Sequence, residues 1–448
     1  MPVNNPNKTS GVPFRLGFLH YSCPPVIGGV EEILSQQASV FHRKGHSVSV
    51  LAGMGEVFTK NFPVRIEPVL GSKNARIIKA HEECKKGHQG ALEGPTNRIY
   101  GILKDWSRDI DVIIAHNVLH MPFNLPLTLA LRRLADSEDG PVVVSWAHDS
   151  PCFQPTPPKY LNGLPWIVLQ HAHPNIRYVT VSESRKELFR KHCGDASWRV
   201  IHNGIDPVRF LYVDQRSVML SEELDLFGRD LVVVQPSRIT PRKNLELAIH
   251  IIRGIKLLGH NVLFVLTGAY DPHEERAVAY YRRLRYWIKE LGLQDNIAIL
   301  AEYRFRNKTK LVPDRVFIRD LYLMADLLLM TSKDEGFGLP LLEAGMIKLP
   351  IACSDIRPFK ELGEGVCFFG LDEPPLFIAG RIVEYLARTN THLMFRNVMR
   401  RYVWDVVYRQ EALPFLREIT GRAGIPDKPG SKDQTPDQRK NRESVTRA

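Results

Sequence analysis

Short apolar runs that alternate with helix-like stretches restrict the fold of this chain more than any other feature of its sequence. Predicted strands cover residues 15–22, 46–51, 111–115, 142–146 and 178–181, and predicted helices cover residues 30–44, 125–134 and 183–191. Gly45 ends the first of these helices and Ser182 is placed to cap the last. This order of elements is typical of an α/β fold built on a parallel sheet.

The same alternation begins again after residue 206, with predicted strands over residues 231–235, 262–266, 297–300 and 327–330 and predicted helices over 244–258 and 276–291. Because 448 residues exceed the size at which a single core stops growing, we predict two doubly wound domains with a boundary near residue 206. A further helix is predicted over residues 399–419, broken at Pro414. The polar ends, residues 1–12 and 421–448, are predicted to be a flexible leader and a disordered tail.

The charge and the cysteines limit the function classes. A formal net charge of +11 attracts anions such as nucleotide phosphates or acidic lipid headgroups, and no RRM, zinc-finger or basic-zipper pattern supports nucleic-acid binding. The six cysteines are scattered without a CxxC pair, which indicates a reducing compartment. No apolar run approaches the roughly 20 residues that cross a bilayer, so we predict a cytoplasmic protein and leave peripheral membrane association open.

The stretch 325–355 combines a buried strand, a Gly336-Phe337-Gly338 loop and a helix that begins near Pro340. A strand that leads through a glycine loop into a helix places free backbone N–H groups and a positive dipole end together, which suits a phosphate. Glu335 and Glu343 flank the loop and can both reach one ligand. A solvated acidic loop followed by an ordinary helix residue is the alternative interpretation.

Two cations follow the predicted strand 231–235. Arg238 and Lys243 lie at the exit of that strand and the entrance of the next helix, where they can grip a diphosphate and stabilise it as a leaving group. A basic surface turn is the alternative.

Polar residues also end the predicted strands of the first half, and the carboxyl ends of parallel strands share one edge of a sheet. His116-Asn117 and His148-Asp149 can hydrogen-bond sugar hydroxyls or assist proton transfer, or the histidines can be satisfied by neighbouring backbone. Gly28 and Gly29 allow close approach of a ligand to the first strand–helix turn. Gly268 is predicted to form a turn, with a phosphate or sugar contact as the alternative.

Three basic segments have no assigned function. The predicted helix 276–291 carries arginines opposite its apolar face and is either a core-packing helix or a patch that lies on a membrane. Residues 58–100 and 303–315 match no pattern that predicts a role. No GxGxxG fingerprint follows the first strand of either half, which argues against a nicotinamide-binding enzyme.

The stretch EGFGLPLLEA resembles the E-x7-E signature of retaining GT-B glycosyltransferases of the family 4 type. Five further matches occur in the same order: GGVE at 28–31, WAHD at 146–149, TVSES at 180–184, VIHNGID at 200–206 and SRITPRKN at 237–244. The resemblance covers about residues 15–420, and ordered motifs are far more specific than any single one.

The resemblance implies a GT-B fold, in which two Rossmann-like domains, here 13–206 and 207–403, face a central cleft and a final helix, here 404–420, crosses back to the first domain. The second domain would hold a nucleotide-diphosphate-sugar donor and the first an acceptor. No DxD metal motif ends a strand, so no cofactor is obligatory and dependence on a divalent metal is not expected.

The resemblance also implies roles for individual residues. Glu343 would bind the ribose hydroxyls, and Glu335 with the backbone of the loop would orient the donor sugar. Arg238 and Lys243 would clamp the diphosphate, and His148 would touch the sugar near C6. The remaining donor contacts are Gly28, Gly29, Gly268, Gly336, Phe337, Gly338 and Leu339, and the acceptor-side candidates are His116, Asn117 and Asp149.

The predicted function is therefore retaining transfer of a hexose, mannose or glucose, from a GDP- or UDP-sugar to a hydroxyl acceptor. In the implied mechanism the acceptor attacks from the front face and the leaving phosphate helps to deprotonate it. A small anionic acceptor such as a glycerate-linked sugar and a lipid-linked acceptor both agree with the charge. The alternative class is a protein that binds sugar nucleotides without turnover.

Overall fold

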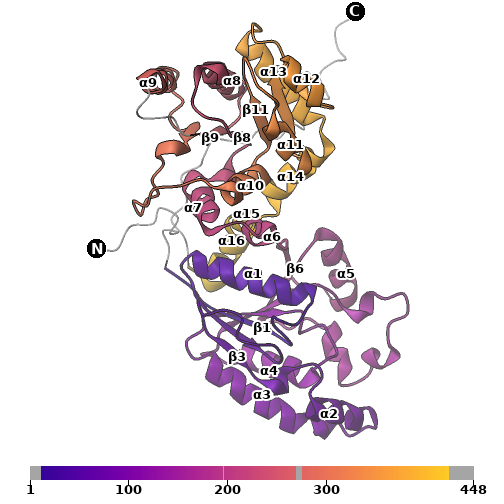
Figure 1. The fold of residues 1–448 in the computed structure, drawn as a ribbon. Coiled ribbons are helices and arrows are strands. Elements are labelled where there is room, and N and C mark those ends of the chain that lie inside the picture. The colour runs from indigo at the N-terminus through magenta and orange to yellow at the C-terminus, as the bar shows by residue number, and fades with distance from the viewer. Residues whose placement is uncertain (1–11, 195, 269–274, 423–448) are drawn as a thin grey trace, which may run out of the picture. The chain divides into compact units, whose positions relative to one another are not determined.

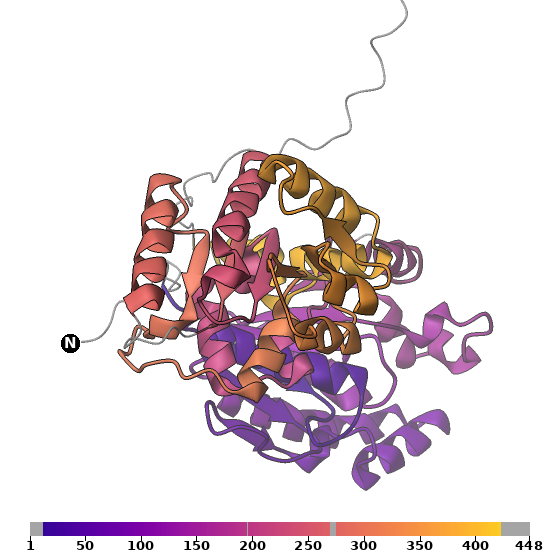
Figure 2. The same cartoon turned by 45° about the horizontal axis from the view of Figure 1, so that its top comes forward.

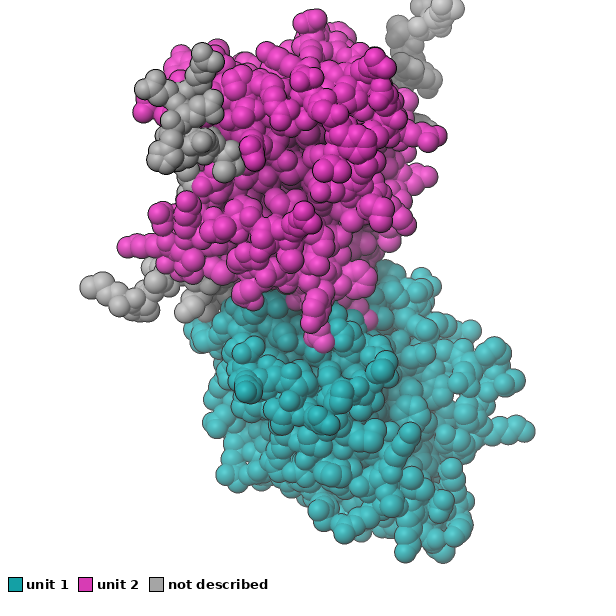
Figure 3. All heavy atoms as spheres, in the orientation of Figure 1, with its two compact units in different colours: residues 1–202, 408–448 teal, residues 203–407 magenta. Residues whose placement is uncertain are grey.

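The computed structural model describes residues 12–194, 196–268 and 275–422. The chain divides into two compact units, one formed by Met1–His202 with Tyr408–Ala448 and the other by Asn203–Val407 (Figure 3). The sequence placed the first crossing near residue 206 and the return near residue 404. The predicted leader and tail lie almost entirely outside the described residues.

Unit 1 contains a seven-stranded sheet in the order β3-β2-β1-β4-β5-β6-β7, and its paired strands run parallel (Figure 1). The strands are β1 Arg15–His20, β2 Ser47–Ala52, β3 Val64–Ile66, β4 Val112–His116, β5 Val142–Ala147, β6 Ile176–Thr180 and β7 Trp198–Val200. The main helices are α1 Gly29–Arg43, α2 Ala75–Lys85, α3 Glu93–Trp106, α4 Leu125–Ala135 and α5 Glu183–Cys193. The strand order reverses between β1 and β4, and ligands bind at such points in open α/β sheets.

The predicted elements of unit 1 form because their strands are buried on both faces. β4 is completely buried, and Ile113 and Ala115 pack against Leu127 and Leu131 of α4. The Ser182 hydroxyl accepts the backbone N–H of Arg185 at 3.2 Å, which confirms the predicted N-cap of α5.

The segment 58–100, for which no role was predicted, contains β3, α2 and most of α3. The side chain of Asn74 caps α2, and Ile99 and Leu103 of α3 enter the core that α4 covers. His81 of α2 accepts the N–H of Leu125 at 3.2 Å, at the first residue of α4. Much of this basic segment therefore builds one face of the unit 1 sheet.

Unit 2 contains a six-stranded sheet in the order β10-β9-β8-β11-β12-β13, whose paired strands also run parallel. The strands are β8 Leu231–Gln235, β9 Val262–Leu266, β10 Ile297–Ile299, β11 Leu327–Met330, β12 Ile351–Ser354 and β13 Cys367–Phe369. Its helices include α6 Pro207–Leu211, α7 Gln215–Leu224, α8 Leu245–Leu257, α9 Glu275–Glu290, α10 Arg315–Met324, α11 Leu339–Met346, α12 Arg357–Leu362, α13 Pro375–Ala387 and α14 Asn390–Arg401. Here the strand order reverses between β8 and β11.

Two helical layers cover the unit 2 sheet. α8, α9 and α13 share one hydrophobic core with Val233 of β8, and α8 lies beside α13 (Figures 1 and 2). α7, α10, α11 and α12 share the opposite core with Val232 and Val234. Alternate residues of one strand thus serve two cores, and this explains its uninterrupted apolar sequence. The basic helix α9 buries Leu284 and Ile288 in the first core, so the core-packing interpretation of its apolar face is confirmed.

The prediction of one helix over 399–419, broken at Pro414, was wrong. α14 already begins at Asn390, and the break falls at residues 402–403, where Ile205 donates its N–H to the Tyr402 carbonyl at 2.7 Å. α15 Trp404–Val407, a π-helical turn at Tyr408–Ala412 and α16 Leu413–Thr420 then follow without interruption. Pro414 occupies the first turn of α16, where proline is tolerated, directly after the π-helical turn.

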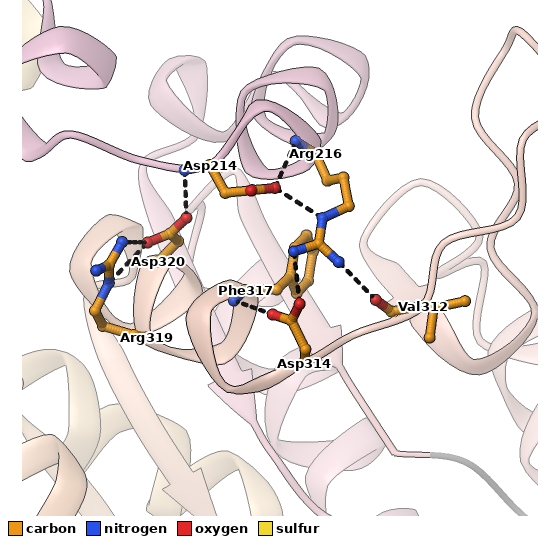
Figure 4. A network of polar contacts seen from close by, with 7 residues as sticks. All are labelled: Asp214, Arg216, Val312, Asp314, Phe317, Arg319 and Asp320. Carbon is orange, nitrogen blue, oxygen red and sulfur yellow. Dashed lines mark hydrogen bonds and ion pairs between the residues drawn. The ribbon is translucent and has the colours of Figure 1, made fainter.

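The end of the basic segment 303–315 belongs to a polar network (Figure 4). The guanidinium group of Arg216 donates to Asp214 and Asp314, each at 2.7 Å, and to the Val312 carbonyl at 3.1 Å. The buried Asp320 carboxylate accepts the N–H of Asp214 at 2.7 Å. These contacts connect the start of α7 to α10, so this part of the segment has a structural role.

A buried ion pair joins β11 to α14. The Asp326 carboxylate accepts the N–H of Val232 at 2.6 Å and lies 3.2 Å from Arg396 Nη1 through both of its oxygens. Burial raises the pKa of Asp326 to about 6, although the guanidinium charge opposes that shift. The carboxylate therefore depends on Arg396 for charge compensation.

We predict that Arg396→Leu lowers the free energy of unfolding by about 3 to 5 kcal/mol, because it leaves a buried carboxylate without its cation. Urea unfolding at neutral pH measures the loss. Arg396→Leu combined with Asp326→Asn should recover part of it, and Arg401→Leu at the exposed end of the same helix is the control. Equal losses in Arg396→Leu and Arg401→Leu would contradict the assignment.

Candidate functional site

The loops that follow β8 and β11 meet because these two strands are neighbours in the sheet. The first loop ends in a 3-10 turn, Pro241–Lys243. Its carbonyl groups accept hydrogen bonds from the second loop: Lys243 O from the Thr331 hydroxyl at 2.9 Å, and Arg242 O from the N–H of Lys333 at 2.8 Å. The backbones of the two loops are thereby held in one arrangement.

Glu335 is the centre of this arrangement. Its Oε1 accepts hydrogen bonds from Lys243 Nζ and from the Ser332 hydroxyl, the latter at 2.8 Å, and its Oε2 lies 3.3 Å from Arg242 Nη1. The side chains of Lys243 and Glu335 are each only 10% exposed. Burial opposes ionisation of Glu335, but the hydrogen bonds from Lys243 and Ser332 and the charges of Lys243 and Arg242 outweigh it and hold its pKa below the usual range.

The sequence selected Lys243, Glu335 and Arg238 for this site, and the structure pairs the first two. Arg238 is exposed in the same loop. Arg242 was not selected, although its position beside Lys243 in a basic doublet was a signal that could have identified it. A Cβ on Gly268 would lie 1.5 Å from the Ser237 carbonyl oxygen, so this glycine allows the β9 end to pack against the turn before Arg238.

The glycine loop leads into α11, whose first turn contains Pro340 as predicted. Gly338 has φ +115°, which glycine alone adopts readily, whereas a Cβ on Gly336 would meet open space. Phe337 and Leu339 are 53% and 61% exposed. The loop therefore presents both backbone and apolar side chains at the surface beside Glu335.

Glu343 lies on α11 and is exposed, but its carboxylate has a fixed partner. The hydroxyl group of Tyr322, a buried residue of α10, donates to Glu343 Oε2 at 3.0 Å. Burial raises the pKa of Tyr322 and the nearby Glu343 charge raises it further, so the phenol stays protonated and can donate. Sequence reasoning missed Tyr322, because this contact depends on how α10 and α11 pack.

Three histidines gather at the carboxyl ends of β1, β4 and β5 in unit 1. His20 Nδ1 lies 2.7 Å from the His116 carbonyl oxygen and must donate to it, since a carbonyl only accepts. His116 Nδ1 lies 3.4 Å from His148 Nε2. Burial lowers the pKa of all three imidazoles, that of His148 to about 4, so they are neutral at neutral pH.

Asn117 and Asp149 are partly committed to the loops that carry them. Asn117 has φ +48°, and its Oδ1 accepts the N–H groups of His148 at 3.1 Å and Asp149 at 3.0 Å. Asp149 Oδ1 accepts the N–H of Ser150 and pairs with Arg185 at 3.2 Å. The amide oxygen that we expected to face a sugar instead orients the turn that carries His148.

The Gly28-Gly29 turn begins α1 beside this cluster. A Cβ on Gly28 would lie 2.1 Å from Glu31 Oε2, whereas one on Gly29 would meet nothing within 4 Å. Glu31 Oε1 accepts the Ser22 hydroxyl at 2.5 Å and lies 3.7 Å from His20 Nε2. Gly28 therefore gives room to the Glu31 carboxylate, and Gly29 leaves the helix start open.

Two negative findings apply to the part of the chain that the structure describes. Within it, no group of three or more His, Cys, Asp or Glu side chains is arranged to hold a metal ion. None of the helices in the described ranges has both the length and the apolar composition that spanning a membrane requires.

Two family models match the chain, one for each half. The family described as Glycosyltransferase Family 4 matches residues 27–209, and the family described as Glycosyl transferases group 1 matches residues 220–364. The two matches are consecutive and together span most of both units.

Individual proteins are similar at lower identity. The mannosylglucosylglycerate synthase of Thermotoga maritima is 24% identical over 92% of this chain and 100% of its own length, and that of Petrotoga mobilis is 23% identical over 62% and 66%. The serotype-specific mannosyltransferase WbdA of Escherichia coli is 38% identical over 84 residues, which are 18% of this chain and 10% of WbdA. This chain thus matches about a tenth of the length of WbdA. A crystallised glycosyltransferase from Rickettsia africae aligns with 92% of this chain and 100% of its own at 17% identity, with a TM-score of 0.36.

We predict that the protein loses stability as the pH falls from 7 to 5, because the unfolded chain binds protons that the buried imidazoles refuse. A folded-state pKa of about 4 for His148, against about 6.5 in the unfolded chain, allows a loss of at most about 2 kcal/mol from this residue by pH 5. Thermal unfolding across this range should show a smaller loss in His148→Gln than in wild type. His88→Gln, which removes an exposed imidazole of the same unit, is the control. Identical pH dependence in wild type and His148→Gln would contradict the burial argument.

Proposed function

Because this chain belongs to the GT-B glycosyltransferases, we propose that it transfers a hexose from a nucleotide-diphosphate sugar to a hydroxyl acceptor, with retention of the anomeric configuration. The observation that carries this proposal is the half-buried Lys243–Glu335 pair at the carboxyl ends of β8 and β11. It places one cation for a diphosphate and one carboxylate for sugar hydroxyls at the reversal of strand order, where such sheets bind ligands.

The proposed site binds the diphosphate through a change of partner by Lys243. The backbone of Lys243 is held by Thr331, so only its flexible side chain has to turn from Glu335 to the phosphates. A diphosphate carries more negative charge than one carboxylate, so it is the stronger partner. The ammonium group then stabilises the charge that develops on the departing nucleoside diphosphate. The exposed Arg238 is the second cation of this clamp.

The carboxylates bind the sugars of the donor. Glu335 is ionised, so its oxygens accept hydrogen bonds from the hydroxyl groups of the hexose, and the Gly336-Phe337-Gly338 backbone supplies N–H groups beside it. Glu343 accepts the ribose hydroxyls, and Tyr322 keeps one of its oxygens oriented while the exposed side of the carboxylate stays available. The motif glutamates thus act as hydroxyl acceptors rather than as nucleophiles.

Unit 1 contributes neutral groups. His148, uncharged at neutral pH, either donates to or accepts from a sugar hydroxyl. His116 is completely buried, so we assign it a supporting contact to His148 in place of a direct contact with acceptor. Gly29 provides the open helix start at which the donor phosphates approach.

The names of the relatives favour mannose as the hexose and a small anionic sugar as the acceptor. Two of them are mannosylglucosylglycerate synthases, and the third is a mannosyltransferase. A net charge of +11 supports an anionic acceptor, because it raises the local concentration of anions. Glucose as the hexose and a lipid-linked acceptor are the alternatives that a donor and acceptor panel distinguishes.

We predict that Lys243→Ala and Glu335→Ala each lower turnover at least about a hundredfold, the usual magnitude for a lost transition-state charge contact. Transfer from GDP-mannose, GDP-glucose, UDP-mannose and UDP-glucose to glucosylglycerate and related acceptors measures the effect. Lys333→Ala is the matched control, since its side chain is exposed and only its backbone N–H joins the loops.

Near-normal turnover in Lys243→Ala would overturn the clamp. A wild-type protein that binds donors in a thermal-shift assay, but neither hydrolyses nor transfers from any of them, would instead support sugar-nucleotide binding without catalysis.

A further inference from the structure

We infer that Arg242 is a positioning residue that keeps Glu335 aimed at the donor sugar while Lys243 is engaged by the diphosphate. The inference rests on the proposed function and deepens it. It divides the two adjacent cations between two tasks: Lys243 changes partner during binding, and Arg242 does not.

The contacts of Arg242 define the direction of the chain at Glu335. Its Nη1 lies 3.3 Å from the Asp334 carbonyl oxygen and 3.3 Å from Glu335 Oε2, so one guanidinium nitrogen bridges the backbone and the side chain of consecutive residues. Its own backbone is anchored, because its carbonyl accepts the Lys333 N–H. Arg242 therefore fixes the carboxylate through Oε2, the oxygen that Lys243 does not use.

The two oxygens of Glu335 have separate sets of partners. Oε1 accepts from Lys243 and Ser332, and Oε2 faces Arg242. When Lys243 turns to the diphosphate, Oε1 keeps the neutral hydroxyl of Ser332, and Arg242 alone balances the charge. A carboxylate that is 10% exposed is costly to leave without a cation, so a second, resident cation is required for the exchange.

The exposure of the two cations agrees with this division. The Arg242 side chain is 54% exposed and that of Lys243 is 10% exposed. Arg242 can stay hydrated at its remaining donors while one nitrogen holds the loop, because a guanidinium group has five N–H donors. Lys243 lies deeper, and the exchange of one buried anion for another leaves it paired throughout.

The charge environment gives this inference a signature in the pH profile. The charged groups of the two loops around Glu335 are Lys243, Arg242 and the exposed Lys333 and Asp334. Cations hold the pKa of Glu335 below its usual range, so removal of one cation raises that pKa. Without Arg242 the carboxylate is protonated at a higher pH, and activity that needs its ionised form is lost earlier on acidification.

The test compares Arg242→Gln, Arg242→Lys and wild type in kcat and kcat/KM from pH 5 to 9, with the nucleotide sugar that the wild type uses. In Arg242→Gln we expect the acid limb of kcat/KM to move to higher pH by at least about half a unit, with a loss of about tenfold at pH 6 and a much smaller one at pH 8.5. Arg242→Lys, which keeps the charge, should restore most of the wild-type profile. Arg282→Gln, which removes an exposed arginine from α9, is the control for net charge.

The outcomes separate the two proposals. A wild type that turns over no nucleotide sugar refutes the proposed function. A wild type that is active, with an Arg242→Gln profile that superimposes on its own, overturns the inference alone. A loss that is equal at every pH also overturns it, because it would assign Arg242 to direct donor contact. Arg242→Met replaces Arg242→Gln in the same comparison if the glutamine variant does not fold.

Discussion

The ion pair between Lys243 and Glu335 is the interaction on which the unit 2 site depends. Neither charge could remain in so enclosed a position alone, because an unpaired buried charge destabilises the fold by several kcal/mol. Backbone hydrogen bonds from Thr331 and Lys333 hold the two loops in register around the pair. A phosphate that enters this site meets a cation that is already in place, and no loop has to close to create it.

The two units solve a similar problem with opposite electrostatics. Each contains a parallel sheet with a reversal of strand order, and polar side chains gather there at the strand ends. In unit 2, neighbouring cations overcome the effect of burial and keep Glu335 ionised. In unit 1, burial dominates and keeps His116 and His148 neutral. This contrast suits unit 2 to a charged phosphate and unit 1 to uncharged hydroxyl groups.

The sequence was sufficient where one physical requirement dominated. Strands 231–235, 262–266 and 327–330 agree with the structure residue for residue, because a run that is apolar at every position fits only a strand covered on both faces. It failed at Pro414, where a π-helical turn accommodates the proline, and in the segment 58–100, whose helices have polar, charged sequences. The partners Arg242 and Tyr322 could not be predicted, because each meets its glutamate only through tertiary packing.

The most direct measurement of the central claim compares the affinities of wild type and Glu335→Gln for the free nucleoside diphosphate and for its sugar donor by calorimetry. If Lys243 exchanges Glu335 for the diphosphate, its release from the carboxylate should make Glu335→Gln bind the free nucleoside diphosphate several-fold more tightly than wild type. The sugar donor should gain less, because the variant also loses a contact to the hexose. Weaker binding of the free nucleoside diphosphate to Glu335→Gln would contradict the exchange.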